Sequence, residues 1–358
     1  MKISIILGTR PEIIKMSPII RNCESLGLDY FILHTGQHYT YTMDKVFFEQ
    51  LELPEAKYNL NVGSGSHAEQ TGKMLIGIEK ILIKEKPNVI LVEGDTNTVL
   101  AGALAAIKLG LPVGHVEAGL RSFDMNMPEE INRILADHSS TYLFAPTQKS
   151  RQILINEGIN EKKIFVTGNT IVDSVFQNIE LSKRKKNVLN NLNLESRNYI
   201  LVTAHRQENV DDKSRFRGII EGLEKIRELG LEIIYPIHPR ARKNLNRFSL
   251  ELNCVRFIEP LNYLSFLQLE SNARLVLTDS GGVQEEACIL GVPCVTLRDN
   301  TERPETLDVG ANVLAGSNPW EIFDKTKLML NHNASWENPF GDGTAGEQII
   351  QLLVKEFA

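Results

Sequence analysis

Cysteine is scarce in this sequence, and the four cysteines, Cys23, Cys254, Cys288 and Cys294, include no Cys-x-x-Cys pair. This spacing excludes a zinc ribbon and a disulfide framework. Reduced thiols are typical of cytosolic proteins. We therefore expect the protein to be cytoplasmic.

Long apolar runs and excess positive charge are also missing. No stretch approaches the ~18 apolar residues of a membrane helix, and the apolar run at 3–7 is too short for a signal peptide. The formal net charge of -6 argues against binding to nucleic acid or to an anionic membrane. We therefore expect a soluble protein with neither kind of partner.

Motifs for metals and common cofactors are absent from the sequence as well. There is no His-Glu-x-x-His, no Walker lysine loop and no Gly-x-Ser-x-Gly elbow. His34 and His38 have a helical spacing, but Gly36 lies between them at the end of a predicted strand, so no helix aligns them. The glycine pair at 281–282 does not fit the dinucleotide pattern. We expect no metal and no cofactor.

The chain of 358 residues, 42% hydrophobic and 23% charged, is long enough for two domains. Short apolar strands alternate with helical patterns, which is typical of βαβ units and parallel sheets. In the first half we expect helices at 97–109 and 129–139 and strands at 3–7, 30–35, 89–93, 113–117 and 142–145, and 165–169 looks like another strand that runs into a turn. In the second half we expect strands at 199–203, 232–237, 255–258, 275–278 and 294–297.

A polar, basic stretch at 182–197 separates the two halves. Segments that begin at Ile90 and Leu275 share one order: strand, acidic turn, helix, Gly-x-Pro, strand. We therefore predict an α/β protein of two Rossmann-like domains with parallel sheets facing a central cleft, divided into 1–168 and 169–345. A last helix at 346–358 is expected to pack back on the first domain. Ligands of such sheets bind at the carboxyl ends of the strands.

Glycines and carboxylates meet at the end of one predicted strand in "LTDSGGVQEEA", residues 277–287. Backbone N–H groups and the helix dipole make Ser280–Gly282 a candidate anion site. A tight turn, with Glu285 and Glu286 favoured by the dipole, explains the same residues equally well.

The N-terminal segment "LGTRPEIIK" has a similar arrangement. Gly8 ends the first strand, and Pro11 suits the first helical position. Arg10 occupies the loop itself, and Lys15 is expected near the same end of the helix. An ordinary surface residue is the favoured interpretation for Lys15, and less so for Arg10.

Basic side chains follow two predicted strands of the second half. His205 and Arg206 follow one strand, and His238 follows another, with Arg240 and Arg242 directly behind it. A lone histidine is usually structural, but two at equivalent positions beside arginines suit a diphosphate.

Three carboxylates lie at strand or loop ends of the first half. Asp95 can cap the helix at 97, and Glu129 can pair with Arg133. Glu117 ends a buried strand, where a carboxylate is costly unless it is satisfied. Carboxylates whose environments separate their pKa values can serve as acid and base.

Eight segments of the sequence together resemble one family. They are "GTRPEIIKMSPI", "TGQH", "EGDTNT", "HVEAGLRS", "PEEINR", "TAHRQEN", "DSGGVQEEA" and "RDNTERPE", in this order along almost the whole chain. The set is similar to that of the non-hydrolysing UDP-N-acetylglucosamine 2-epimerases and is far more specific than any one motif.

The resemblance implies the GT-B architecture and the interconversion of UDP-N-acetylglucosamine and UDP-N-acetylmannosamine. UDP would leave by anti elimination to give 2-acetamidoglucal and would add back after protonation of the opposite face, without NAD. The product would supply activated N-acetylmannosamine for polysaccharide or glycan synthesis. The partners implied are the two sugar nucleotides and UDP, and a homodimer is expected.

The resemblance also assigns roles to residues. Asp95, Glu117 and Glu129 are the implied acid and base set, with the base and the acid not distinguished, and His205 assists departure of the diphosphate. The implied contacts to UDP or sugar are Arg10, Lys15, His205, Phe266, Ser280, Gly281, Gly282, Glu286 and Arg303. Phe266 fits a helix core equally well. The elements of a second, activating substrate site are Gln37, His38, Arg206 and His238.

Three other functions fit parts of the sequence. A GT-B glycosyltransferase shares the fold and nucleotide site but needs an acceptor. A hydrolysing epimerase releases free N-acetylmannosamine, and the absence of an added kinase domain weighs against it. A nucleotide-sugar sensor has no need for three convergent acids.

Overall fold

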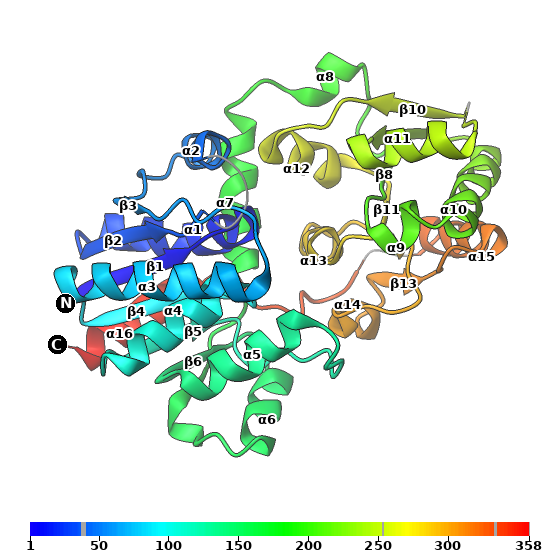
Figure 1. The fold of residues 1–358 in the computed structure, drawn as a ribbon. Helices are drawn as coiled ribbons and strands as arrows, with labels where there is room; N and C mark the ends of the chain where they lie inside the picture. The colour runs from blue at the N-terminus through cyan, green and yellow to red at the C-terminus, as the bar shows by residue number, and fades with distance from the viewer. Residues whose placement is uncertain (37–40, 253, 333–334, 358) are drawn as a thin grey trace. The chain divides into compact units, whose positions relative to one another are not determined.

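The computed structural model describes residues 1–36, 41–252, 254–332 and 335–357. The chain forms two compact units, each with its own sheet (Figure 1). Unit 1 comprises Met1–Gln177 and Phe340–Ala358, and unit 2 comprises Asn178–Pro339. Unit 2 is therefore inserted into the sequence of unit 1.

Unit 1 contains a seven-stranded sheet of order β3-β2-β1-β4-β5-β6-β7, with every described pairing parallel. The strands are β1 (Lys2–Leu7), β2 (Asp29–His34), β3 (Tyr58–Asn59), β4 (Val89–Glu93), β5 (Val113–Val116), β6 (Tyr142–Ala145) and β7 (Ile164–Val166). The helices are α1 (Arg10–Ser25), α2 (Tyr41–Gln50), α3 (His67–Glu85), α4 (Asn97–Lys108), α5 (Pro128–Ser139), α6 (Gln148–Asn156), α7 (Thr170–Lys183) and α16 (Ala345–Glu356), with a 3-10 turn at Glu161–Lys163.

Unit 2 contains a six-stranded parallel sheet of order β10-β9-β8-β11-β12-β13. Its strands are β8 (Tyr199–Thr203), β9 (Glu232–Pro236), β10 (Val255–Ile258), β11 (Leu275–Thr278), β12 (Cys294–Thr296) and β13 (Asn312–Leu314). Its helices are α8 (Val188–Leu192), α9 (Gln207–Val210), α10 (Lys213–Ile226), α11 (Pro239–Phe248), α12 (Tyr263–Asn272), α13 (Gly281–Ile289), α14 (Pro304–Asp308) and α15 (Pro319–Leu330), with a 3-10 turn at Arg227–Leu229.

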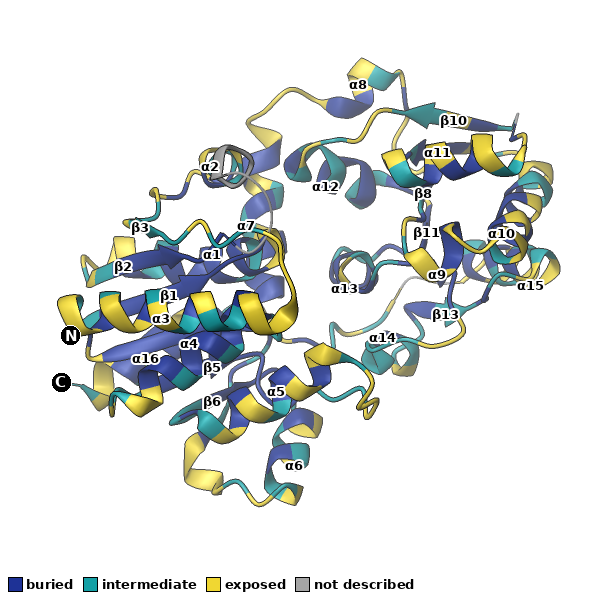
Figure 2. Cartoon of the chain, in the orientation of Figure 1, coloured by how far each residue is buried: buried dark blue, intermediate teal, exposed yellow. Residues whose placement is uncertain are grey.

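Both sheets are buried between helices, as the dark strands of Figure 2 show. In unit 1, alternate strand residues such as Ile6 and Val92 pack against Met74 of α3 and Val99 of α4 in one apolar cluster. Side chains alternate across a strand, so each sheet needs a helical layer on both faces. The predicted α/β class with two Rossmann-like parallel-sheet domains is confirmed.

The predicted strands are all present, with ends that are identical or differ by one residue. β5 ends at Val116 because Glu117 turns into the left-handed region, at φ 69°. β3 and β13 were not predicted, since strands of two and three residues give almost no periodic signal.

The division between the units falls after Gln177 rather than after residue 168. The first turns of α7 are held by unit 1, because Ser174 Oγ donates to the backbone carbonyl of Ile14 at 2.9 Å. The Asp173 carboxylate also accepts from the backbone N–H groups of Ala345 and Gly346, at 3.2 and 2.8 Å. These two amides begin α16, which packs against α1.

Among the described residues, no helix is both long and apolar enough to cross a membrane.

Candidate functional site

The first half-site lies at the carboxyl ends of β1, β4 and β5 in unit 1. Thr9 is the N-cap of α1 and forms a capping box with Glu12, and Pro11 occupies the first turn. Glu12 is buried and accepts hydrogen bonds from the backbone N–H groups of Gly8 and Thr9 at 2.8 and 2.6 Å. It also accepts from the Thr96 hydroxyl at 2.7 Å, which ties the start of α1 to the loop after β4.

Lys15 extends from α1 into a pair of buried glutamates. Its Nζ donates to the Glu117 carboxylate and lies 3.4 Å from Oε1 of Glu93, the last residue of β4. The side chain of Lys15 is 13% exposed, and those of both glutamates are 3% exposed. The interpretation of Lys15 as an ordinary surface residue is therefore wrong.

Glu117 has a strained backbone. Its φ of 69° lies in the region that favours glycine, and such strain is characteristic of functional sites. The turn places its carboxylate beside Lys15 instead of continuing β5. The location of Glu117 fits an acid or base role.

Burial shifts the acidity of two of these carboxyls. Burial raises the pKa of Glu12 from 4.5 to about 7, against the effect of its hydrogen bonds to Thr96, Gly8 and Thr9. Burial also raises the pKa of Glu93 well above its usual range. The positive charge of Lys15 opposes this increase, whereas the nearby Glu117 and Glu12 add to it. Such shifts gathered in one place mark the ends of these strands as a candidate functional site.

Asp95 lies two residues beyond β4 and pairs with Arg133 of α5. Arg133 donates to Asp95 at 2.6 and 3.0 Å and to Glu130 at 2.6 Å. The cap of α4 is Thr96, whose hydroxyl accepts from the Thr98 N–H, so the capping role considered for Asp95 is wrong. The pairing considered between Glu129 and Arg133 is replaced by that with Glu130, and Glu129 is exposed.

A buried network behind this half-site supports the loops that carry Asp95 and Glu117. His115 Nε2 donates to the Gly94 carbonyl at 2.8 Å, and its Nδ1 donates to the Asp137 carboxylate at 2.7 Å. Asp137 also accepts from the Gly119 N–H at 3.2 Å and pairs with Arg121 at 2.7 Å. Burial opposes the charge of Asp137, but His115 and Arg121 lower its pKa, so it remains ionised.

The remaining predicted residues of unit 1 are less informative. Arg10 is exposed, with its guanidinium 5.7 Å from the centre of the Phe47 ring. Gln37 and His38 lie outside the described residues.

The second half-site lies at the carboxyl ends of β8 and β11 in unit 2. Asp279, fully buried, accepts hydrogen bonds from the backbone N–H groups of His205 and Arg206, both at 3.0 Å, and from Asn209 Nδ2 at 3.2 Å. The acidic residue at the end of β11 thus fixes the loop after β8. This gives Asp279 a structural role that the sequence did not reveal.

His205 and His238 line one cavity of about 310 Å³, together with Phe266 and Val283. The centres of the His205 and His238 imidazole rings lie 6.1 Å apart. Burial lowers the pKa of His238, and the charges of His205 and Arg240 lower it further. Phe266 both lines this cavity and packs on the apolar cluster of α8 and α12, so the two interpretations of Phe266 are compatible.

The segment Ser280–Gly282 begins α13, with Ser280 at the N-cap and Gly281 as the first helical residue. A Cβ at Gly281 would overlap the carboxylate oxygen of Glu302. Glu302 pairs with Arg298 at 2.7 Å and with Arg206 at 3.0 Å. Burial opposes its charge, but these arginines hold the pKa of Glu302 at about 2. The helix N-terminus and the arginines together give this turn the character of an anion site.

The two glutamates of the first turns of α13 have separate partners. Glu285 pairs with Arg303 at 2.9 Å. Glu286 accepts from the Tyr263 hydroxyl at 2.9 Å and contacts the buried Glu270, whose pKa is raised first by burial and then by Glu286. Neither glutamate is explained by the helix dipole alone.

Sequence reasoning missed several buried acids, among them Glu12, Glu93, Glu270 and Asp279. Glu93 was included in an apolar strand and Glu12 in a helix start. The available signal was a carboxylate within an otherwise apolar strand, which is costly unless it has partners. The other two could be found only from the packing of their helices and strands.

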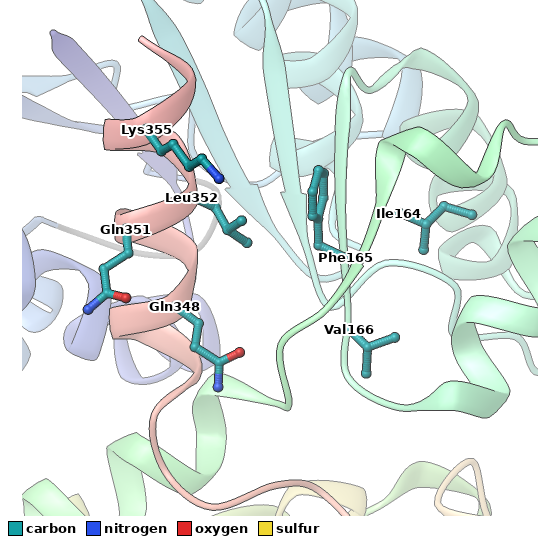
Figure 3. A pocket seen from close by; sticks show the side chains of 7 residues that line it. All are labelled: Ile164, Phe165, Val166, Gln348, Gln351, Leu352 and Lys355. Atoms are coloured by element: carbon teal, nitrogen blue, oxygen red, sulfur yellow. The ribbon is translucent and has the colours of Figure 1, made fainter. Parts of the chain in front are cut away.

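A separate hollow, of about 560 Å³, lies between β7 and α16 in unit 1 (Figure 3). Phe165 and Leu352 face one another there, and Lys355 and Gln348 border it. It contains no predicted site residue. Across the described residues, no cluster of three or more histidine, cysteine or acidic side chains could hold a metal.

Comparison with known proteins gives close matches over the whole chain. A family model described as UDP-N-acetylglucosamine 2-epimerase matches residues 21–354. A protein of Methanocaldococcus jannaschii named UDP-N-acetylglucosamine 2-epimerase is 59% identical over 99% of both chains. A protein of Pseudomonas aeruginosa named UDP-2,3-diacetamido-2,3-dideoxy-D-glucuronate 2-epimerase is 43% identical over 99% of this chain and 100% of its own.

Solved structures agree with these matches. The crystal structure of the Methanocaldococcus jannaschii UDP-GlcNAc 2-epimerase in complex with UDP-GlcNAc and UDP is similar with a TM-score of 0.89, at 59% identity over 99% of this chain and 100% of that chain. That of the Neisseria meningitidis UDP-GlcNAc 2-epimerase bound to UDP-GlcNAc has a TM-score of 0.88, at 36% identity and the same coverage.

Proposed function

Since the chain belongs to the UDP-N-acetylglucosamine 2-epimerase family, we propose that it interconverts UDP-N-acetylglucosamine and UDP-N-acetylmannosamine. The observation that carries this proposal is the buried ion pair of Lys15 and Glu117 at the strand ends of unit 1. It holds a carboxyl in a fixed position, as a proton transfer at carbon 2 requires. The product would supply activated N-acetylmannosamine for polysaccharide or glycan synthesis.

We propose that the reaction passes through elimination, because the proton on carbon 2 has no neighbouring carbonyl to acidify it. UDP leaves carbon 1 as the proton leaves carbon 2, which gives 2-acetamidoglucal. UDP then adds back to carbon 1 while carbon 2 receives a proton on the opposite face. Atoms and charges balance without a redox cofactor.

In this proposal unit 1 supplies the acid and base. Glu117 is supported by its burial, its ion pair with Lys15 and its strained backbone. Asp95 is supported by its place at the carboxyl end of β4 and its pairing with Arg133. Glu129 belongs to the set by resemblance alone, and Arg10 and Lys15 are assigned to UDP or sugar on the same ground.

Unit 2 supplies the nucleotide contacts. Ser280, Gly281 and Gly282 would bind phosphate through the N-terminus of α13. His205 and Phe266 would contact the diphosphate and the uracil from the cavity that they line. Glu286 would accept hydrogen bonds from ribose hydroxyls, and Arg303 would lie near the diphosphate, ordered by Glu285.

A second substrate has an observation in its favour. The Pseudomonas aeruginosa relative carries the name of a 2-epimerase for a diacetamido glucuronate nucleotide. Because the chemistry at carbon 2 is the same, the proposed acids and base serve either sugar. The two candidates differ at carbons 3 and 6 of the sugar, so the test must include both.

Three further parts of the proposal rest on the resemblance. The protein acts in the cytoplasm as a homodimer. A second substrate molecule activates it at a site that includes Arg206 and His238, together with Gln37 and His38. The adjacent His205 and His238 rings would link the two ligands.

The test is proton NMR of the purified protein with UDP-N-acetylglucosamine in D2O, without NAD, metal or acceptor. Growth of the UDP-N-acetylmannosamine anomeric signal, with deuterium at carbon 2, is the expected result. Release of free N-acetylmannosamine would identify a hydrolysing enzyme instead. Saturable binding with an unchanged spectrum would contradict the proposal, unless the diacetamido glucuronate nucleotide reacts in the parallel sample.

A further inference from the structure

Glu93 is one of the buried acids of the first half-site, and the proposed reaction assigns no step to it. It is the last residue of β4, and its side chain is 3% exposed. Its Oε1 accepts no hydrogen bond from the described residues. Such an atom is expensive if the carboxyl is ionised.

The groups that face Glu93 come from two other elements. Lys15 and Glu12 extend from α1, and Glu117 follows β5. Lys15 makes its closer contact with Glu117, whereas its distance to Glu93 is 3.4 Å. Beyond Glu117, His115 of β5 is paired with Asp137. Glu93 therefore has two carboxyls as neighbours and one ammonium, which lies closer to Glu117 than to Glu93.

The Glu93 and Glu117 carboxyls share one buried ammonium, because Nζ of Lys15 contacts Glu117 and lies 3.4 Å from Oε1 of Glu93. Two carboxylates beside one another disfavour each other's charge, and one ammonium balances only one of them. One of the two carboxyls therefore carries a proton. Lys15 favours the charged form of the carboxyl that it contacts more closely, which is Glu117.

We propose that Glu93 is a positioning residue that stays protonated and donates its hydrogen bond to the Glu117 carboxylate. Glu117 is then held in one orientation between the Glu93 hydroxyl and the Lys15 ammonium. This assignment rests on the proposed function where it concerns turnover. The proton on Glu93 itself does not depend on that function.

The experiment compares the full-length protein with Glu93→Gln, Glu93→Ala and a control, Glu69→Gln. Glutamine retains a donor of the same size as a protonated carboxyl, whereas alanine removes it. Glu69 is exposed on α3 and pairs with Lys73, and its pKa is lowered by that partner, so it is ionised at neutral pH. Infrared difference spectra at neutral pH report whether a substituted carboxyl was protonated.

We expect wild type minus Glu93→Gln to contain the C=O band of a protonated carboxyl, and wild type minus Glu69→Gln to contain only carboxylate bands. Turnover of Glu93→Gln should stay close to wild type, and Glu93→Ala should lose about 10²-fold in kcat through misplacement of Glu117, with KM nearly unchanged. If the alanine variant fails to fold, the infrared spectrum and the turnover of Glu93→Gln still test the inference.

Carboxylate bands alone in the Glu93→Gln difference would overturn the inference. Equal loss of turnover in the glutamine and alanine variants would overturn the positioning role. If no variant and no wild-type sample epimerises the sugar nucleotide, the proposed function fails, and the infrared band still decides the proton on Glu93.

Discussion

Replacing Glu12 by glutamine should change how the stability of unit 1 depends on pH. Burial raises the pKa of Glu12 from 4.5 to about 7. The folded state therefore holds a proton between these values that the unfolded chain has lost. Stability from this group falls as pH rises through that window. At about 1.4 kcal/mol for each pH unit, the difference amounts to roughly 3 kcal/mol.

Glutamine cannot ionise, so Glu12→Gln removes this pH dependence. The free energy of unfolding of wild type minus that of the variant should fall by about 3 kcal/mol between pH 4.5 and pH 7.5. Other titrating groups cancel in this difference, provided that they are unchanged. The variant should therefore gain relative stability as the solution becomes more basic.

Urea unfolding at a series of pH values provides the measurement. Both tryptophans, Trp320 and Trp336, belong to unit 2. Far-ultraviolet circular dichroism follows both units, whereas tryptophan fluorescence follows unit 2 and serves as the internal control. A difference that is flat or rises with pH would refute the reasoning, because Glu12 would then be ionised throughout.

Three other predictions concern single side chains. Glu117→Gln should lower kcat at least about 10²-fold with the Kd for UDP, measured by calorimetry, unchanged; retained turnover would remove Glu117 from the acid and base set. Gly281→Ala should destabilise unit 2 in unfolding followed by fluorescence, because the added Cβ would overlap the Glu302 carboxylate. Gly282→Ala should not, because the atom nearest to its Cβ is Ser280 Oγ at 3.9 Å. Equal unfolding midpoints for the two variants would contradict this prediction. Asp279→Asn should cost about 1–3 kcal/mol, because one of the two carboxylate oxygens that accept from the backbone N–H groups becomes an amide donor. An unchanged midpoint would contradict this prediction.

The fold could be predicted from the sequence because buried parallel strands are read as short apolar runs. The strands at 3–7 and 89–93 needed no knowledge of their neighbours. The division of the domains was harder to place, because α7 continues across it and gives no break in the pattern. Contacts between elements, such as those of Asp173 and Ser174, assign the first turns of α7 to unit 1.

The candidate site was only partly visible. Asp95, Glu117 and His205 follow strands, so their location was predictable, and their roles remain predictions. The ion-pair partners of Arg133 could not be predicted. Arg133 pairs with Asp95 and Glu130 rather than with Glu129, because this depends on how α5 packs against the loop after β4. Glu93 was hidden because one polar residue at the end of an apolar strand leaves the strand pattern intact.

The insertion of unit 2 into unit 1 has a consequence for synthesis. A ribosome releases residues 178–339 before it releases α16. Unit 2 therefore has its complete sequence while unit 1 still lacks the amides that satisfy Asp173 and the helix that covers α1. Domains fold as units during translation. Unit 2 is thus the first to be completed, and unit 1, which begins the chain, is completed last.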